Sequence, residues 1–223
     1  MITSASRKRR RKEQQKFKYA KNREASLKIL EAVIDTLNKH DIAYYLDFGT
    51  LIGAIREKGF ILWDDDMDIS LLNESDYHKM PEIMKEVEKK GFIVDALSFI
   101  YSINRKISKA AKNPAIEVYT RDISFTSDSN CRVIKVKNHR YFGKLGSGKN
   151  ILDIFFKYQK DEDLFWMAQD KVHSISKELL SKELIEIDFY HLKCTIPKNY
   201  DDYLTSIYGD WKTPKEDWQY YEQ

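Results

Sequence analysis

The sequence predicts an α+β, or mixed α/β, domain. An amphipathic helical pattern near the N-terminus is followed by a short aromatic strand and a second helical pattern. The middle of the chain, residues 92–156, contains several short β-like runs, and helical patterns return toward the C-terminus. Helices and strands that alternate in this irregular order are typical of a mixed sheet packed against helices, not of an all-α or all-β fold.

Periodicity defines the elements of the first quarter of the chain. Residues 13–40 are expected to form a helix, because apolar side chains recur at spacings of three and four: Leu27, Leu30, Val33, Ile34 and Leu37. The apolar, aromatic run 42–46 (IAYYL) indicates a strand. Gly49 and Thr50 then begin a second helical pattern, which Gly59 is expected to end.

The later elements follow from the same reasoning. Strand character resumes at residues 67–72, and residues 74–90 are expected to form a charged helix capped by Asn73 or Ser75. The β-rich middle predicts strands at 92–94, 99–104, 116–119, 132–137 and 151–156. Toward the C-terminus we expect a helix at 164–180, a strand at 190–196, and a short helix at 201–207 that ends at Tyr208-Gly209.

Length and charge limit the organisation of the chain. With 223 residues, one domain is expected, spanning 13–223 after a basic arm at 1–12. A net charge of +3 from 38 basic and 35 acidic residues is too balanced for a bulk nucleic-acid binder, so no nucleic-acid partner is expected. The run Arg7–Lys12 (RKRRRK) is either a disordered tail or an arm that contacts anionic lipid or nucleic acid, and of these contacts we expect at most a peripheral one with the membrane.

Cysteine usage and hydrophobicity bear on location. Cys131 and Cys194 are far apart and form no CxxC pattern, and the five histidines show no zinc-ligand spacing. Reduced, buried cysteines suit a cytoplasmic protein. The basic N-terminus lacks the apolar region of a secretory signal, and no run approaches the roughly 20 apolar residues of a spanning helix. We therefore expect a cytoplasmic protein, at most peripheral on the inner face of the membrane.

Four carboxylates within five positions mark the segment YLDFGTLIGAIREKGFILWDDDMDI, residues 45–69. Asp64, Asp66 and Asp68 have the same parity, so an extended strand would place them on one face, roughly 6.5–7 Å apart. Such carboxylates repel one another, and a hard divalent ion, Mg²⁺ or Mn²⁺, would relieve the repulsion. Asp65 is expected to point the other way. The alternative, an acidic surface loop, fits poorly with the apolar residues around it.

Other residues of the segment suggest phosphate binding. Gly49 and Thr50 lie at a strand-to-helix junction, where backbone N–H groups favour a phosphate oxygen, although Gly-Thr is also an ordinary way to begin a helix. Arg56, further along this helix, could neutralise phosphate charge or pair with a nearby aspartate.

A further carboxylate, Asp153, lies inside the apolar run ILDIFF, where burial is costly unless the charge is paired or bound to a metal. The alternative is a solvent-facing aspartate at a strand end. The preceding GKLGSGKN resembles a P-loop, but Asn150 and a strand follow Lys149 where Ser or Thr and a helix are required. Lys149 could still contact a phosphate.

Residues 49–69, GTLIGAIREKGFILWDDDMDI, resemble the signature of the LicD family, which includes bacterial phosphocholine transferases and the fukutin-related proteins. Leu62 replaces the proline that is usual in the family, a change that affects loop stiffness. Asp153 matches a later "DIF" element, and residues 200–214 are similar to a closing "YL…YGDW…P" segment. The resemblance implies a nucleotidyltransferase-like fold, with a mixed sheet flanked by helices. It also implies a metal-bound Asp-x-Asp with a third acid on a neighbouring strand.

On this basis, Asp66, Asp68 and Asp153 are the expected catalytic residues, and Asp64 joins them as a metal ligand. The expected reaction moves a phosphorylated alcohol, phosphocholine above all, from a CDP-linked donor to a hydroxyl of a cell-surface glycan or lipid-linked precursor such as lipopolysaccharide, teichoic acid or capsule. Ethanolamine, glycerol and ribitol phosphates remain alternative groups. Two further hypotheses stay open: nucleotidyl transfer from an NTP, and a non-catalytic glycan-binding module.

Overall fold

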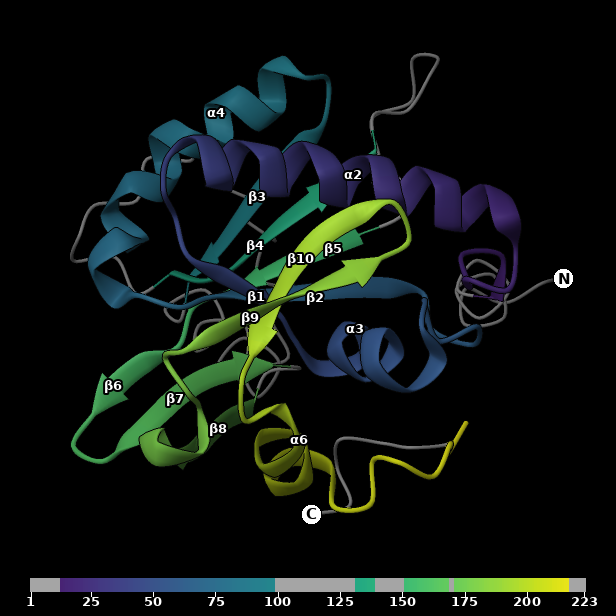
Figure 1. The fold of residues 1–223 in the computed structure, drawn as a ribbon. Coiled ribbons are helices and arrows are strands. Elements are labelled where there is room, and N and C mark those ends of the chain that lie inside the picture. The colour runs from purple at the N-terminus through teal and green to yellow at the C-terminus, as the bar shows by residue number, and fades with distance from the viewer. Residues whose placement is uncertain (1–12, 99–130, 139–150, 169–170, 217–223) are drawn as a thin grey trace, which may run out of the picture.

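A computed structural model describes residues 13–98, 131–138, 151–168 and 171–216, and its fold is α+β, as predicted (Figure 1). A mixed five-stranded sheet forms the centre, and helices and two smaller sheets pack around it. Several predicted features lie outside the described residues: the arm Arg7–Lys12, the strands 99–104 and 116–119, and Lys149. Within the described part of the chain, no helix is long and apolar enough to cross a membrane.

The central sheet has the strand order β1-β2-β5-β4-β3. The parallel pair β2–β5 lies inside the sheet, and the other neighbours are antiparallel. The strands are β1 (Tyr44–Leu46), β2 (Asp66–Leu71), β3 (Ile93–Ser98), β4 (Cys131–Lys137) and β5 (Ile151–Phe155). All five were predicted, although β3 runs on beyond its predicted end at residue 94. The parallel pair matters for function because it brings Asp68 and Asp153 into register.

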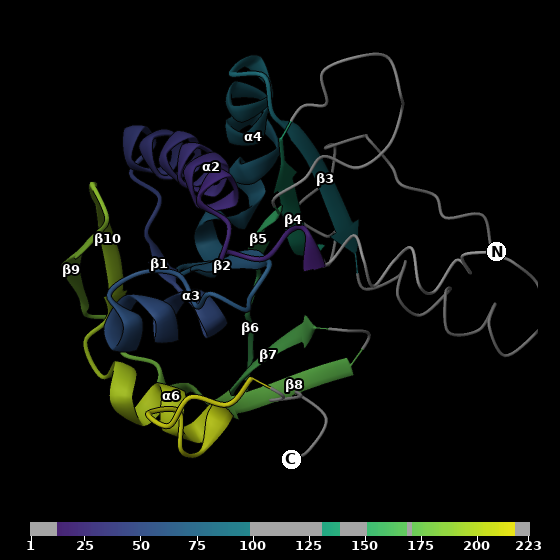
Figure 2. The same cartoon turned by 90° about the vertical axis from the view of Figure 1, so that its right-hand side faces the viewer.

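The two faces of the central sheet differ in chemistry. One face carries apolar side chains that are completely buried, including Met67, Ile69, Leu152, Ile154 and Ile134. The helices α2 (Ala20–Lys39) and α4 (Met80–Lys89) pack against each other and lie together on one side of the sheet (Figures 1 and 2). Because successive strand residues alternate between faces, Asp66, Asp68, Asp153, Lys135 and Lys137 fall on the opposite face.

Helix α2 confirms the predicted apolar stripe, since all five of its predicted core residues are buried. It begins at Ala20, however, later than the predicted residue 13. The preceding residues pair instead with the loop before β2: the Phe17 N–H donates to the Asp64 carbonyl and the Lys18 N–H to the Leu62 carbonyl. Phe17 also stacks on Phe60, with ring centroids 4.2 Å apart. Tertiary pairing therefore overrides helical propensity in this segment.

Helix boundaries near the loops depend on proline and on left-handed residues. The predicted helix 74–90 is a 3₁₀-helix, Glu74–Lys79, followed by α4, because Pro81 lacks an N–H and is best placed in a first helical turn. Asn73 occupies the N-cap position, but its side chain makes no capping hydrogen bond. Helix α3 (Phe48–Ile52) continues as a π-helix, Gly53–Glu57, which ends at the left-handed residue Lys58, one residue before the predicted Gly59.

The predicted helix at 164–180 is wrong. These residues form β7 (Asp163–Ala168) and β8 (Lys171–Ser176), which pair with β6 (Tyr158–Lys160) in a three-stranded antiparallel sheet and lead into a 3₁₀ turn, Lys177–Leu179. A left-handed residue, Asp161, forms the turn between β6 and β7. The apolar residues fit both periods, and antiparallel pairing between neighbouring strands, β6 with β7 and β7 with β8, decides between them.

A two-stranded hairpin precedes the last helix. Strand β9 (Leu184–Phe189) was not predicted, and β10 (Leu192–Pro197) begins two residues after the predicted position. Tyr190, with φ of 58°, occupies the tight turn between them. The hairpin lies beside β1, where the Thr195 hydroxyl donates to the Tyr44 carbonyl. Helix α6 (Tyr200–Tyr208) ends at Gly209, as predicted.

Candidate metal centre

Three predicted carboxylates lie on one face of two adjacent strands. Strand β2 begins at Asp66, so Asp66 and Asp68 project from the same side of the sheet. The parallel register places Asp68 opposite Asp153 on β5. Residues in register share a face, so the sheet brings Asp66, Asp68 and Asp153 together, although Asp68 and Asp153 are far apart in the sequence.

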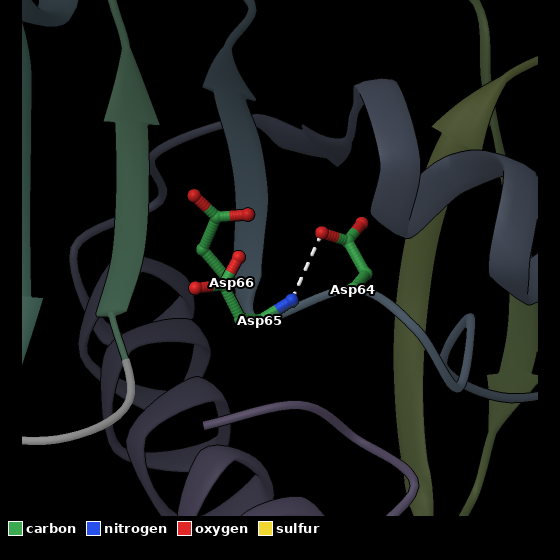
Figure 3. A group of neighbouring side chains, drawn as sticks. All are labelled: Asp64, Asp65 and Asp66. Carbon is green, nitrogen blue, oxygen red and sulfur yellow. Dashed lines mark hydrogen bonds between the residues drawn. The ribbon is translucent and has the colours of Figure 1, made fainter. Parts of the chain in front are cut away.

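The carboxylates of Asp64, Asp65 and Asp66 form a tight group, with one oxygen of each within 4.8 Å of the others (Figure 3). The prediction that Asp65 points away from its neighbours is therefore wrong. Alternation between faces applies only from Asp66 onward, because Asp64 and Asp65 precede the strand. The Asp65 N–H donates to Asp64 Oδ1 at 2.9 Å.

Burial raises the pKa of Asp66 and of Asp68 well above the usual aspartate range. Electrostatic repulsion between carboxylates raises these pKa values further. Asp64 and Asp153 repel the charge of Asp66, and Asp66 and Asp153 repel the charge of Asp68. Carboxylates that resist ionisation for these reasons are stabilised when a divalent cation neutralises them. The electrostatics of the site therefore favour a bound cation.

Asp153 provides a test of whether such a cation fits. The residue is 6% exposed, and its Oδ2 accepts a hydrogen bond from Lys135 Nζ. Its other oxygen, Oδ1, is buried and has no hydrogen-bond partner among the described residues. A buried carboxylate oxygen without a partner is costly, and a metal ion would satisfy it. The all-oxygen donor set is the one that Mg²⁺ and Mn²⁺ prefer, so these residues fit the expected metal.

Lys135 on β4 belongs to the site but was not predicted from the sequence. It contacts Asp153, and its charge lowers the pKa of Asp66. Burial alone would lower the pKa of Lys135 itself, but Asp153, Asp66 and Asp68 raise it above the ordinary lysine value. A weak sequence signal could have indicated it: Lys135 lies between Ile134 and Val136 in the predicted strand 132–137, where a buried charge needs a partner, but Lys137 in the same strand carries the same signal.

The first turn of α3 holds the backbone of Asp68. The Asp68 N–H donates to Thr50 Oγ1 at 2.8 Å, and the Asp68 carbonyl accepts from the Asp47 N–H at 3.0 Å. The Thr50 hydroxyl thus replaces the backbone acceptor that β1 would have supplied had it continued. Thr50 is 3% exposed, so its contact in this structure is with Asp68, and its predicted role toward a phosphate remains a prediction.

Gly49 allows Asp64, in the loop before β2, to approach α3 closely. A Cβ atom at this position would lie 2.6 Å from Asp64 Oδ2, well inside van der Waals contact. Any larger residue would therefore displace the Asp64 carboxylate. The position of Gly49 within the predicted site is explained by this contact, while its predicted phosphate contact remains a prediction.

A buried ion pair fixes the turn that leads into α3. The Asp47 carboxylate accepts four hydrogen bonds, from the Phe48 N–H at 2.8 Å, the Tyr203 hydroxyl at 2.7 Å, Lys157 Nζ at 2.7 Å and the Ser70 hydroxyl. These bonds stabilise Phe48 in a left-handed conformation, with φ of 44°, that bulky residues rarely adopt. Sequence analysis did not identify this cluster, because its members come from four separate segments.

Aromatic rings surround the ammonium group of that pair. Lys157 Nζ lies 4.8–5.2 Å from four ring centroids, those of Tyr45, Phe48, Trp166 and Tyr203. Burial lowers the pKa of Lys157, and Asp47 opposes this effect. The rings and the carboxylate together compensate for the removal of the lysine charge from water.

Arg56 does not pair with the aspartates in this structure. Its Nε donates to Glu57 Oε1 and its Nη1 to the Trp211 carbonyl, both at 2.6 Å. These contacts connect the π-helix to the segment after α6. A role for Arg56 toward a phosphate remains a prediction.

Known proteins are similar to parts of this chain. The model of a family described as "LicD/FKTN/FKRP, nucleotidyltransferase domain" matches residues 41–199, from β1 through β10. An uncharacterized protein of Rickettsia prowazekii is 34% identical over 85 residues, which cover 37% of this chain and 32% of the relative. An uncharacterized protein of Rickettsia typhi is 32% identical over 78 residues, which cover 34% and 25%.

A relative with a named activity also matches. The lipopolysaccharide cholinephosphotransferase LicD of Haemophilus influenzae is 42% identical over 57 residues, which cover 26% of this chain and 21% of that protein. In all three relatives, the matched segment spans less than a third of the relative's length.

Proposed function

The chain belongs to the LicD/FKTN/FKRP family of nucleotidyltransferase domains, and on this premise we propose that it is a metal-dependent phosphotransferase. The proposed donor is a CDP-linked alcohol, CDP-choline above all, and the proposed acceptor is a hydroxyl of a glycan or lipid-linked glycan. The name of the Haemophilus influenzae relative, lipopolysaccharide cholinephosphotransferase, supports phosphocholine as the transferred group and lipopolysaccharide as the class of acceptor.

One observation carries the proposal: Asp66, Asp68 and Asp153 share a sheet face, and the buried Oδ1 of Asp153 has no hydrogen-bond partner among the described residues. These three residues, with Asp64, would hold Mg²⁺ or Mn²⁺. The ion, when bound, would neutralise the diphosphate of the donor and the charge that develops on the departing CMP. The backbone contacts of Asp68 to Thr50 and Asp47 keep its carboxylate in position for this role.

The proposed reaction is an in-line displacement. The acceptor hydroxyl oxygen forms a bond to the phosphorus of the transferred group, the P–O bond to CMP breaks, and CMP leaves with the electron pair. The hydroxyl proton passes to a carboxylate, for which Asp153 is the proposed acceptor because it lies on the same sheet face as Asp66 and Asp68. Positioning and charge neutralisation are sufficient for such a step, so no covalent nucleophile is required.

A donor screen tests the proposal. Purified protein is incubated with Mn²⁺ or Mg²⁺ and, separately, with the choline, ethanolamine, glycerol and ribitol derivatives of CDP, and CMP release is measured. We expect metal-dependent CMP release with at least one donor and its loss in Asp68→Asn, while circular dichroism and thermal melting show that the variant is folded. Full activity in this variant would contradict the assignment of Asp68.

The nucleotidyltransferase description of the family supports a second candidate, attack on the α-phosphorus of an NTP. Incubation with CTP and ATP separates the two, because nucleotidyl transfer releases pyrophosphate and phosphoalcohol transfer releases CMP. If neither product forms and the protein binds a glycan without metal, the third hypothesis, a non-catalytic glycan-binding module, would be favoured.

A further inference from the structure

We propose that Lys135 is a phosphate-binding residue of this site. Its ammonium group neutralises Asp153 in the metal-free protein and binds a phosphate oxygen of the donor once the carboxylates hold their cation. This inference rests on the proposed function and extends it, because it assigns a recognition role to a residue outside the aspartate signature.

The register of the sheet places Lys135 between two carboxylates. It lies opposite Asp95 on β3 and opposite Asp153 on β5, and Asp153 in turn lies opposite Asp68. Asp95 is paired with Lys137, so Lys135 turns toward the site and hydrogen-bonds Asp153 Oδ2. Of the two lysines on this face of β4, Lys135 is therefore the one that contacts the candidate metal site, and Lys137 contacts Asp95.

The hydrogen-bonding capacity of Lys135 is only partly used. An ammonium group has three N–H donors, and Asp153 is the one hydrogen-bond acceptor of Lys135 among the described residues. The Lys135 side chain is 27% exposed, whereas that of Lys137 is 10% exposed and packed against Asp95. Lys135 can thus donate further hydrogen bonds to a ligand, while Lys137 is enclosed in a structural ion pair.

The charge of the site provides a reason for such a cation. The site holds five carboxylates: Asp153, Asp66 and Asp68 act on the charge of Lys135, and Asp64 and Asp65 lie beside Asp66. A nucleoside diphosphate is also anionic, and carboxylates close to it would repel it. A phosphate oxygen that shares a cation with Asp153 would lie beside the carboxylate that Lys135 already contacts, so Lys135 can bind it without leaving its strand position.

Two binding measurements on the folded proteins test this role. Calorimetry follows Mn²⁺ binding to the metal-free protein, and then the binding of CDP, with cytidine as the phosphate-free control, to the Mn²⁺-saturated protein. We compare Lys135→Met with wild type, with Lys135→Arg, and with Lys137→Met. The last variant is a matched control, because Lys137 lies two residues away on the same face and pairs with a carboxylate outside the site.

In Lys135→Met we expect Mn²⁺ to bind as tightly as in wild type or several-fold more tightly, because a competing cation is gone. CDP should bind about tenfold or more weakly, the loss expected for one charge-assisted hydrogen bond, and cytidine should be unaffected. Lys135→Arg should recover most of the CDP affinity, and Lys137→Met should match wild type in both measurements once thermal melting shows it to be folded. Lys135→Gln replaces Lys135→Met if the latter does not fold.

Three results would overturn the role. CDP affinity equal to wild type in Lys135→Met would show that the lysine does not contact phosphate. Parallel weakening of Mn²⁺ and CDP binding would show that it merely orients Asp153. An equal loss of CDP binding in Lys137→Met would show that removing either lysine of β4 weakens CDP binding, and that no specific contact of Lys135 is responsible. If wild type binds Mn²⁺ but no CDP, CDP-choline or CTP, the proposed function itself fails, a result that is distinct from all three.

Discussion

Lys157 Nζ lies 2.7 Å from Asp47 Oδ2, in an ion pair whose two side chains are 3% and 0% exposed and 110 residues apart in the chain. Asp47 begins the turn into α3, and its N–H holds the carbonyl of Asp68. The position of Asp68 therefore depends on Lys157, which follows β5. Lys157 acts through Asp47, to which it is hydrogen-bonded.

The first prediction concerns this pair. Lys157→Met should lower the free energy of unfolding by about 3–5 kcal/mol, because it leaves a carboxylate buried without its counter-charge. The double variant Asp47→Asn/Lys157→Met should lose less than the sum of the single variants, since no uncompensated charge remains. Urea denaturation measures all three. Strict additivity would show that the two charges do not act as a pair.

The second prediction concerns Thr50. Thr50→Val keeps the shape of the side chain but leaves the Asp68 N–H without its acceptor, which should cost about 1–3 kcal/mol of stability. Because Asp68 is then less firmly held, Mn²⁺ should also bind more weakly. Thr50→Ser keeps the hydroxyl and should retain most of the metal affinity. Calorimetry measures the affinity of both variants for Mn²⁺. Equal Mn²⁺ affinities in Thr50→Val and Thr50→Ser would exclude a role of the Thr50 hydroxyl in positioning Asp68.

The third prediction concerns pH. Asp66 and Asp68 have a higher pKa in the folded protein than in the unfolded chain, so the folded protein holds their protons more tightly. Their contribution to stability is therefore greatest below the unfolded carboxyl pKa of about 4 and declines as pH rises through the raised values. Metal binding requires the ionised carboxylates, so its stabilising effect should increase with pH.

Thermal melting between about pH 5 and pH 8, in EDTA and in MnCl₂, measures both effects. The control is Asp66→Asn/Asp68→Asn, in which the decline of metal-free stability with pH should be smaller than in wild type. The stabilisation by Mn²⁺ should be absent from this variant. A wild-type protein whose metal-free stability falls no more steeply than that of the variant would contradict the raised pKa values.

The fourth prediction compares two glycines. A Cβ at Gly49 would meet the carboxylate of Asp64, which can move, whereas a Cβ at Gly53 would lie 2.5 Å from the backbone carbonyl of Gly59. Gly49→Ala should therefore weaken Mn²⁺ binding with little change in melting temperature, and Gly53→Ala should lower the melting temperature. Melting curves and Mn²⁺ titrations check both. A large loss of stability in Gly49→Ala with unchanged metal affinity would reverse the interpretation.

The local pattern of the chain was sufficient for much of the fold and part of the site. The spacing of Asp66 and Asp68 determines that they share a face, because side chains in any strand alternate with a period of two. The apolar spacing of residues 27–37 determines which side of α2 is buried. Asp153 was identified because a carboxylate in an apolar run needs a partner wherever the strand lies.

Where local patterns are ambiguous, only the tertiary structure could decide. Residues 164–180 can satisfy a helical or an extended pattern, and pairing of β7 with β6 and of β8 with β7 makes residues 164–168 and 171–176 strands. Asp65 joins its neighbours because the strand begins one residue later, at Asp66. The contacts of Asp153 with Lys135, and of Asp47 with Lys157, join distant segments. Strand order and register determine such contacts, and they depend on how the whole core packs, which no short stretch of sequence encodes.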